Sequence, residues 1–359
     1  MSTQSLGFIE AMSTPSQISI FPATSASATR VAELLQQQHP HIRLRLAARS
    51  PQKLTASANG SVSSTPFDIN RAASIQDALQ GSDAAYVLNP PFYFGGKHPS
   101  VLSQTFADNL VKAANETSTL NKIVFLSALG VDKTSGIGIS NNLRIGENTL
   151  LTGLNDGIHV VTLRTPLFLS NFKFTFGMVL NPPHILASEL PFDKPTNFID
   201  ATSMAKTAIK YLISPALTTS SSNAGGKRTF TAVQIVTRKK SIPEIAAMLS
   251  EITGFQVNAL PIPEEQWPQA FKQLGISDHW STWLLKRARR PKAAMPATWM
   301  NKAFRARRSV ASPLLPRMSI TISRQPWRAS SKRRRVANQL TKSIIPLLSA
   351  LALRGLDAC

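Results

Sequence analysis

Short apolar runs alternate with helical patterns along the first half of the chain. The runs are rich in β-branched residues and are bounded by turn formers, which is typical of buried strands. They predict strands at Ile18–Phe21, Leu44–Ala47, Ala84–Leu88, Ile123–Ser127 and Val160–Arg164, with a weaker one at Thr65–Asp68. Apolar residues at helical spacing predict helices over Ala28–Gln38, Ser74–Gln80, Leu102–Ala114 and Asn142–Leu154. This alternation predicts an α/β fold, a doubly wound parallel sheet covered by helices on both faces.

The alternation loosens after residue 165. The segment TPLFLSNFKFTFGM is rich in phenylalanine, which suits either the wall of an apolar pocket or an ordinary core. Asp200 is placed to cap one helix, and Ser241 with Glu244 forms the pattern of a capping box before another that Gly254 ends. Further helices are predicted over Glu264–Leu274 and Ser277–Leu285. We therefore expect a dinucleotide-binding Rossmann core over 16–165 and a smaller substrate-side region over 166–285.

Basic residues are distributed unevenly. The net charge is +21, yet residues 1–285 carry 22 Lys and Arg against 18 Asp and Glu, whereas residues 286–359 carry 18 against one. The second segment is proline-rich and shows no sustained period, so it predicts a basic tail of low order. Two interpretations are open. A shifted reading frame or retained intron is favoured by the abrupt rise in arginine, and a genuine arm would make Lys332–Arg335 a nucleic-acid or nuclear-import patch.

Cysteine usage and hydropathy restrict the compartment. The one cysteine, Cys359, excludes an intrachain disulfide. No apolar run reaches the ~20 residues of a membrane span, and the first residues lack the pattern of a secretory signal. We expect a cytoplasmic protein without a membrane partner, or a nuclear one if the basic arm is genuine. No metal site is predicted.

The turn between the first predicted strand and helix, FPATSASA, stands where a dinucleotide fold binds a pyrophosphate. On the G-x-x-G-x-x-G spacing of short-chain dehydrogenases, Pro22, Ser25 and Ala28 occupy the glycine positions. Alanine can replace a glycine that permits close packing, but proline has a fixed φ and no N–H. Hydroxyl groups in the turn can compensate or can serve as helix caps. The residues expected at the pyrophosphate are Ala23, Thr24, Ser25 and Ala26.

The end of the second predicted strand bears on the choice of cofactor. A carboxylate there would bind the ribose hydroxyls of NAD, whereas a basic side chain accepts the extra phosphate of NADP. The sequence LAARSPQKL supplies Arg49 and Lys53 and no carboxylate. The pattern favours NADP, with NAD as the alternative.

The proton-transferring pair of ordinary short-chain dehydrogenases, Tyr-x-x-x-Lys on one helix, has no good match. The chain holds only Tyr86, Tyr93 and Tyr211. Tyr93 and Lys97 have the spacing, but the two glycines between them predict a loop, where the pair would not share a helix face. We do not expect this pair to act as a catalytic dyad.

Several segments, in the same order, resemble the NmrA-like group of atypical short-chain dehydrogenases, which includes the fungal ergot-alkaloid dehydrogenase type. They are FPATSASATRVAELL, LAARSPQKL, FDINRAASIQDALQGSDAAYVLNPP, NKIVFLSALGVD, ENTLLTGLNDGIHVVTLRTPLFLSNF and SIPEIAAMLSEITGFQVNALPIPEEQWPQAFKQLGIS. The resemblance covers roughly residues 16 to 285.

The resemblance implies roles for particular residues. Asp68 and Ile69 would contact the adenine, and Ser127 would line the nicotinamide and serve catalysis. Arg144 stands near the place where relatives carry a lysine, and it would orient substrate or phosphate because a guanidinium stays protonated. Simpler roles remain open, since Asp68 could cap a helix and Ser127 could bond its own turn. The residues implied beside the nicotinamide ribose are Asn89, Pro90 and Pro91.

These observations predict an NADP(H)-preferring oxidoreductase. Hydride would pass between the nicotinamide and a C=O, C=N or C=C group of a small apolar substrate, and the resemblance implies a role in fungal secondary metabolism. The alternative is a non-catalytic, NADP-sensing regulatory protein that acts through a protein partner. The missing Tyr-x-x-x-Lys pair favours this alternative.

Overall fold

The computed structural model describes residues 14–54, 60–92, 97–134, 137, 140–188, 190, 192–214, 230–237 and 239–266. Within these residues the largest sheet has seven strands in the order β10-β6-β5-β4-β1-β2-β3. All neighbouring pairs in it are parallel. The strands are β1 (Gln17–Phe21), β2 (Arg43–Ala48), β3 (Val62–Pro66), β4 (Ala84–Leu88), β5 (Lys122–Ala128), β6 (His159–Thr165) and β10 (Phe230–Gln234).

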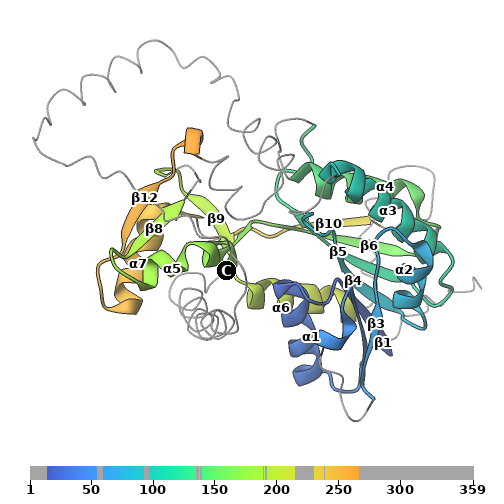
Figure 1. Cartoon of the computed structure of the whole chain (residues 1–359). Helices are drawn as coiled ribbons and strands as arrows, with labels where there is room; N and C mark the ends of the chain where they lie inside the picture. Colours follow the sequence, from blue (N-terminus) through green and yellow to red (C-terminus); the bar gives the residue numbers. More distant parts are fainter. Residues whose placement is uncertain are drawn as a thin grey trace, which may run out of the picture.

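Helices cover both faces of this sheet (Figure 1). One core lies under α1 (Ala26–Gln38) and α6 (Ala201–Ile213). A second core lies on the opposite face under α2 (Ala72–Leu79), α3 (Pro99–Asn115) and α4 (Ser140–Gly153). The central strands are buried on both faces, which is why they read as continuous apolar runs in the sequence. The predicted doubly wound, Rossmann-like α/β class is confirmed.

A second region follows β6 and has a core of its own. Its small sheets have the orders β11-β9-β7 and β12-β8. They comprise β7 (Leu167–Phe168), β8 (Ile185–Ser188), β9 (Thr196–Ile199), β11 (Lys239–Lys240) and β12 (Asn258–Pro261), with α5 (Phe176–Leu180) and α7 (Ile242–Thr253). Short 3-10 turns are η1 (Pro51–Lys53), η2 (Leu169–Phe174) and η3 (Glu264–Gln266).

The chain passes between the two regions more than once. α6 begins directly after β9 of the second region, yet it packs on the large sheet beside α1, and β10 then pairs with β6 (Figure 1). The division at residue 165 therefore separates elements that share the first core. As a statement about domains it stays a prediction.

The helix boundaries predicted from capping residues agree with the structure. Asp200 caps α6 with Oδ1, which accepts the N–H groups of Thr202 and Ser203. The capping box of Ser241 and Glu244 begins α7, and Gly254 ends it at φ +78°. The weak strand expected at Thr65–Asp68 is misplaced. β3 ends at Pro66 because Asp68 accepts the N–H of Asn70 and starts a turn.

Several predictions concern residues outside the described part of the chain. These are the helix Ser277–Leu285, most of the helix Glu264–Leu274, and the basic tail 286–359 with Lys332–Arg335. Among the helices that the structure describes, none combines the length and apolar character of a membrane span.

Candidate cofactor and active site

The turn after β1 closes without glycine. The Ala23 N–H donates to the carbonyl of Ala47 on β2, at 2.8 Å, and the Ser25 N–H donates to the Pro22 carbonyl at 3.3 Å. Ser25 is the N-cap of α1, and its Oγ accepts the N–H of Ala28 at 3.1 Å. Ala28 is fully buried against the strands, the place where a third glycine usually permits close packing. The hydroxyl of Ser25 thus holds the turn together, and the Ala23 N–H is not available to a phosphate.

The first turn of α1 still offers donors to an anion. The backbone N–H groups of Ala26 and Ser27 have no hydrogen-bond partner in the described part of the chain. Thr24 and Ala26 are exposed, so this helix terminus is open to solvent. Free N–H groups and the positive end of the helix dipole together favour a phosphate group. The predicted pyrophosphate position is therefore chemically competent, although it relies on α1 rather than on a glycine loop.

The basic residues expected at the adenosine ribose follow β2. Arg49 follows the last residue of β2 and is exposed. Lys53 ends η1, and its side chain is outside the described atoms. An exposed guanidinium at the carboxyl end of β2 suits an additional phosphate on the adenosine ribose.

The residues implied at the adenine occupy the turn after β3. Asp68 is half-buried, and its Oδ1 accepts hydrogen bonds from the backbone N–H and the side-chain amide of Asn70, at 2.9 and 3.1 Å. The carbonyl of Ile69 accepts the amide of Asn109 on α3 at 2.9 Å. Asp68 therefore shapes this turn, whatever it contacts when cofactor is bound.

The ends of β4 and β5 hold polar atoms without partners. Asn89 follows β4, and its Nδ2 donates to Ser103 Oγ at 2.9 Å and to the Asn142 carbonyl at 3.5 Å. Its Oδ1 is buried and has no hydrogen-bond partner among the described residues, and the same holds for Oγ of Ser127 near the end of β5. Unsatisfied buried polar atoms are costly and uncommon in folded proteins. These two lie where a nucleotide's nicotinamide half would be held, since ligands of parallel sheets bind at the carboxyl ends of the strands. The residues present therefore fit a nicotinamide cofactor.

The two prolines after Asn89 are followed by an unusual backbone. Pro90 is half-buried, Pro91 is exposed, and Phe92 has φ of +50°. A positive φ is uncommon for a phenylalanine. Tyr93 lies outside the described residues, so the predicted loop between it and Lys97 is not placed.

Arg144 is turned toward its own helix. Its Nε and Nη2 donate to Oδ1 of Asn141, at 3.2 and 2.9 Å. The side chain is half-buried in the first half of α4. This interaction leaves a fixed positive charge near the site but supplies no acid or base.

Tyr86 on β4 was not expected near the cofactor turn. It is fully buried, its hydroxyl donates to Sδ of Met204 on α6, and Ser27 of α1 bonds the phenol as well. Burial raises the pKa of Tyr86, so the phenol stays neutral and tied between two helices. It is a structural link under the phosphate turn and not a proton donor for substrate.

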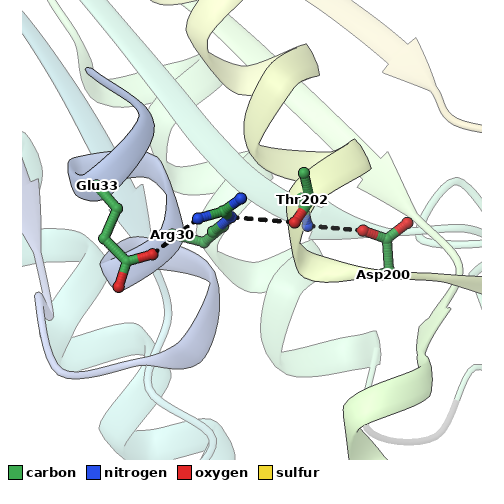
Figure 2. Close-up of polar contacts among 4 residues, drawn as sticks. All are labelled: Arg30, Glu33, Asp200 and Thr202. Atoms are coloured by element: carbon green, nitrogen blue, oxygen red, sulfur yellow. Dashed lines mark hydrogen bonds and ion pairs between the residues drawn. The ribbon is translucent and has the colours of Figure 1, made fainter. Parts of the chain in front are cut away.

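A second link joins the same two helices at their first turns. Arg30 Nε donates to Oγ1 of Thr202 on α6 at 3.0 Å, and Arg30 Nη1 pairs with Glu33 at 3.0 Å (Figure 2). Thr202 in turn donates its N–H to Asp200, the cap of α6 (Figure 2). No sequence signal identifies this contact, because its residues are 172 positions apart. The N-terminal part of α1, where the pyrophosphate is predicted to bind, is thus attached to the helix that leaves the second region.

A buried ion pair lies between α4 and β6. Glu147 accepts Nε and Nη2 of Arg164 at 3.2 and 2.8 Å, and both side chains are largely buried. One feature of the sequence could have indicated this ion pair. An arginine inside the apolar strand HVVTLRT requires a buried partner of opposite charge.

The phenylalanine-rich segment after β6 is mostly core. Phe172 and Phe176 are buried in the second region's core, and the Phe172 ring lies 5.6 Å from that of Phe198. Leu167 and Phe168 of β7 are only half-buried. Of the two interpretations of this segment, ordinary packing holds for Phe172 and Phe176. Among the described side chains of the segment, the half-buried residues of β7 remain candidates for a substrate contact.

Residues 23–149 match the model of a protein family described as NAD(P)H-binding. This segment is an NAD(P)H-binding domain. It extends from the phosphate turn into α4 and includes every residue expected at the cofactor. The prediction of a nicotinamide cofactor is confirmed. No curated protein matches the sequence.

Solved structures share the fold of the chain at low sequence identity. An NADPH-dependent quinone oxidoreductase from Escherichia coli, complexed with NADPH, is 20% identical over 75% of this chain and 87% of that one, with a TM-score of 0.58. The triphenylmethane reductase of Citrobacter sp., complexed with NADP(H), is 16% identical over 79% and 94%, with a TM-score of 0.58. NmrA, a negative transcriptional regulator, is 14% identical over 70% and 76%, with a TM-score of 0.52. The resemblance to the NmrA-like group is confirmed at the level of fold and NAD(P)H-binding domain.

Proposed function

We propose that this protein is an NADPH-dependent reductase. The observation that carries the proposal is the pair of unpartnered buried atoms, Asn89 Oδ1 and Ser127 Oγ, at the carboxyl ends of neighbouring strands of an NAD(P)H-binding domain. A site that bound only the phosphates of the nucleotide would not need a buried hydrogen-bond acceptor and a buried hydroxyl at the ends of β4 and β5. A bound nicotinamide and a substrate would give both atoms partners.

The preference for NADPH over NADH rests on charge. Arg49 is exposed at the end of β2, where a carboxylate would select the unphosphorylated ribose. Asp68, the next carboxylate after Arg49 along the chain, accepts hydrogen bonds from Asn70 and follows β3 instead. The relatives crystallised with NADPH or NADP(H) are in line with this preference.

The substrate would be small and apolar, with a reducible C=O, C=N or C=C group. Half-buried Leu167 and Phe168 flank the end of β6 and would face it. Proteins of the same fold include reductases of quinones and of triphenylmethane dyes, which are conjugated molecules. A role in fungal secondary metabolism and a cytoplasmic location stay predictions from the sequence.

The chain's own residues would act mainly by positioning. Bound NADPH supplies a hydride at C4 of its nicotinamide. Asn89 is held by Ser103 and by the Asn142 carbonyl so that its Oδ1 can accept a hydrogen bond, and Ser127 supplies a hydroxyl beside it. Fixed geometry of this kind lowers the entropic part of the barrier.

The test is calorimetric titration of the full chain with NADPH and NADH, followed by single-turnover absorbance of bound NADPH with a panel of quinones, enones and imines. We expect tighter binding of NADPH and oxidation by at least one quinone. Binding without oxidation by any member would contradict the reductase, and absence of binding would contradict the cofactor site.

A regulatory function is the second candidate, and one observation favours it. α4, which carries Tyr and Lys in ordinary short-chain dehydrogenases, has neither residue over Ser140–Gly153, and its Arg144 is bound to Asn141. Cofactor binding without hydride transfer, together with a protein partner whose affinity depends on the NADP⁺ to NADPH ratio, would support this function over the reductase.

A further inference from the structure

Arg164 is a largely buried cation at the carboxyl end of β6 to which the proposed function gives no role. The strand register places it directly opposite Ser127 of β5, so the two side chains emerge on the same face of the sheet. That face is the one under α4, because Arg164 bonds Glu147 of that helix. Only 15% of the Arg164 side chain is exposed.

The distance between α4 and the sheet is set by a glycine. A Cβ built on Gly146 would lie 2.6 Å from Cζ of Phe125, so a larger residue would require the helix or this buried ring to shift. Phe125 precedes Ser127 by two residues and shares its face. The next helix residue, Glu147, is thereby brought against the sheet, where its carboxylate meets the guanidinium of Arg164.

The ion pair fixes the orientation of the guanidinium and leaves part of it free. Glu147 takes Nε and Nη2 in a bidentate arrangement, which is directional as well as strong. Nη1 has no hydrogen-bond partner among the residues that the structure describes. Hydrogen bonding to Glu147, with the charges of Glu147 and Asp132, raises the pKa of Arg164, so the group is a permanent cation. Asp132 lies in the loop after β5, at the same edge of the sheet.

We propose that Nη1 of Arg164 and Oγ of Ser127 together bind the substrate oxygen that gains negative charge during reduction. The proposal rests on the proposed function and names the oxygen-binding donors of that site. A carbonyl or quinone oxygen between a hydroxyl and a fixed cation would give both unpartnered groups an acceptor. Donors held in place before reaction stabilise developing charge without reorganising.

The electron balance of the step is simple. A hydride brings two electrons and one hydrogen to the substrate carbon, and the C=O π pair moves onto oxygen. Arg164 and Ser127 stabilise this oxyanion by hydrogen bonds, and a proton from solvent completes the alcohol. With a quinone the hydride adds at one oxygen instead, electron pairs shift through the ring onto the opposite oxygen, and a solvent proton converts that phenolate into the hydroquinone. Arg164 keeps its own protons, since a guanidinium does not titrate in this range. Glu147 is a positioning residue, because it acts only through Arg164.

The principal test removes both charges at once. In the double variant Glu147→Gln with Arg164→Met, shape is kept and no buried charge is left unpaired, so folding is protected. We expect kcat and kcat/KM for a quinone to fall together by about 100-fold, with the Kd for NADPH unchanged. Arg45→Met is the matched control, because Arg45 on β2 also lies in the sheet but donates to the Asp77 carbonyl beneath α2.

A binding measurement tests the same site without turnover. The anion of 2-hydroxy-1,4-naphthoquinone carries charge on oxygen and changes colour with its surroundings, so it reports binding to the NADP⁺ complex of the full chain. We expect about 10-fold weaker binding to the double variant and to Ser127→Ala, and unchanged binding to Arg45→Met. Equal affinity in all four proteins, including the unmodified chain, would overturn the proposal.

Two further variants guard against a folding defect. Arg164→Lys keeps a positive charge beside Glu147 but lacks the guanidinium's additional N–H donors that would bind the substrate oxygen. We expect kcat to fall about 10-fold. In Arg164→Ala, added methylguanidinium should restore kcat in a saturable way, whereas methylammonium should not. Failure of rescue in a folded variant, with kcat unchanged in Arg164→Lys, would overturn the role of Arg164. If the unmodified chain binds NADPH but reduces no substrate, the proposed function fails, and the anion measurement still decides the role of Arg164.

Discussion

The two ends of the cofactor site differ in how their polar groups are satisfied. At the phosphate end, the turn after β1 uses its own groups, since the Ser25 hydroxyl caps Ala28 and the Ala23 N–H bonds Ala47. At the proposed nicotinamide end, Asn89 Oδ1 and Ser127 Oγ are buried and have no hydrogen-bond partner in the described part of the chain. The groups of the first end are satisfied without a ligand, whereas on our proposal those of the second end are completed by one.

This difference separates stability from binding. Removing a group that already has a partner in the fold should lower the free energy of unfolding. Removing a group whose partner is a ligand should instead weaken the binding of that ligand. The loss of glycines from the turn becomes understandable on this basis. In place of flexible glycines, the turn has a serine that caps α1 and an alanine that packs closely against the strands. The N–H groups of Ala26 and Ser27, which have no partner among the described residues, can still bind an anion.

The largest effect should come from a negative charge at the helix terminus. In Ala26→Asp the new carboxylate would face the diphosphate, and we expect the Kd for NADPH to rise about 30-fold. The melting temperature should stay the same or rise, because a carboxylate in the first turn suits the helix dipole. Calorimetry and thermal melts measure the two quantities. Ala26→Asn is the neutral control, and equal affinities for NADPH in both variants would remove the diphosphate from this terminus.

A smaller effect on affinity is expected at the end of β2. Arg49→Met should weaken NADPH binding about 10-fold and leave NADH binding nearly unchanged, since only NADPH carries the additional phosphate. Arg43→Met is the matched control, because Arg43 is an exposed arginine at the opposite end of the same strand. If both variants alter the NADPH to NADH affinity ratio equally, net charge and not Arg49 sets the preference.

The sharpest test of the comparison is a pair of serine variants. Ser25→Ala should lower the free energy of unfolding by about 1 kcal/mol, because the helix cap is lost. Ser127→Ala should leave the apo protein as stable or slightly more stable, because it removes an unpaired buried hydroxyl. Denaturant titration of the apo protein compares them. Equal destabilisation by the two substitutions would break the distinction between the ends.

Elements with strong local patterns were predictable from the sequence. The expected strand Ala84–Leu88 coincides with β4, and Asp200 and Ser241 cap the helices that their spacing indicated. β10 was not predicted, because FTAVQ is short, half-exposed and follows a long polar segment. Its place in the large sheet depends on α6 returning to the first region, which no local pattern records.

The candidate site was predictable only in its positions along the chain. Strand ends located Arg49, Asn89 and Ser127, because parallel strands bring their carboxyl ends to one edge. Whether an atom is free or occupied depends on contacts far apart in sequence. The bond from Asn89 to Ser103 is of this kind, and so is the pairing of Glu147 with Arg164, which Gly146 permits.

The smallest expected effect lies at the opposite edge of the sheet and should leave both ends of the site untouched. His159 begins β6, is buried, and bonds Thr231 of β10 through Nε2 at 3.0 Å. Burial, together with the charge of Lys122, lowers the pKa of His159. As pH falls, His159 therefore becomes protonated near pH 6.5 in the unfolded chain, while it stays neutral in the folded chain until a lower pH.

The free energy of unfolding should accordingly fall as pH drops below about 6.5, and the loss should stop below the folded-state pKa of His159. In His159→Asn this part of the dependence should vanish, as followed by urea unfolding at several pH values. The Kd for NADPH should be the same in both proteins at each pH, because the amino edge of the sheet is remote from the cofactor. A pH-dependent difference in Kd between them would show that the two edges are coupled through β5 and β6.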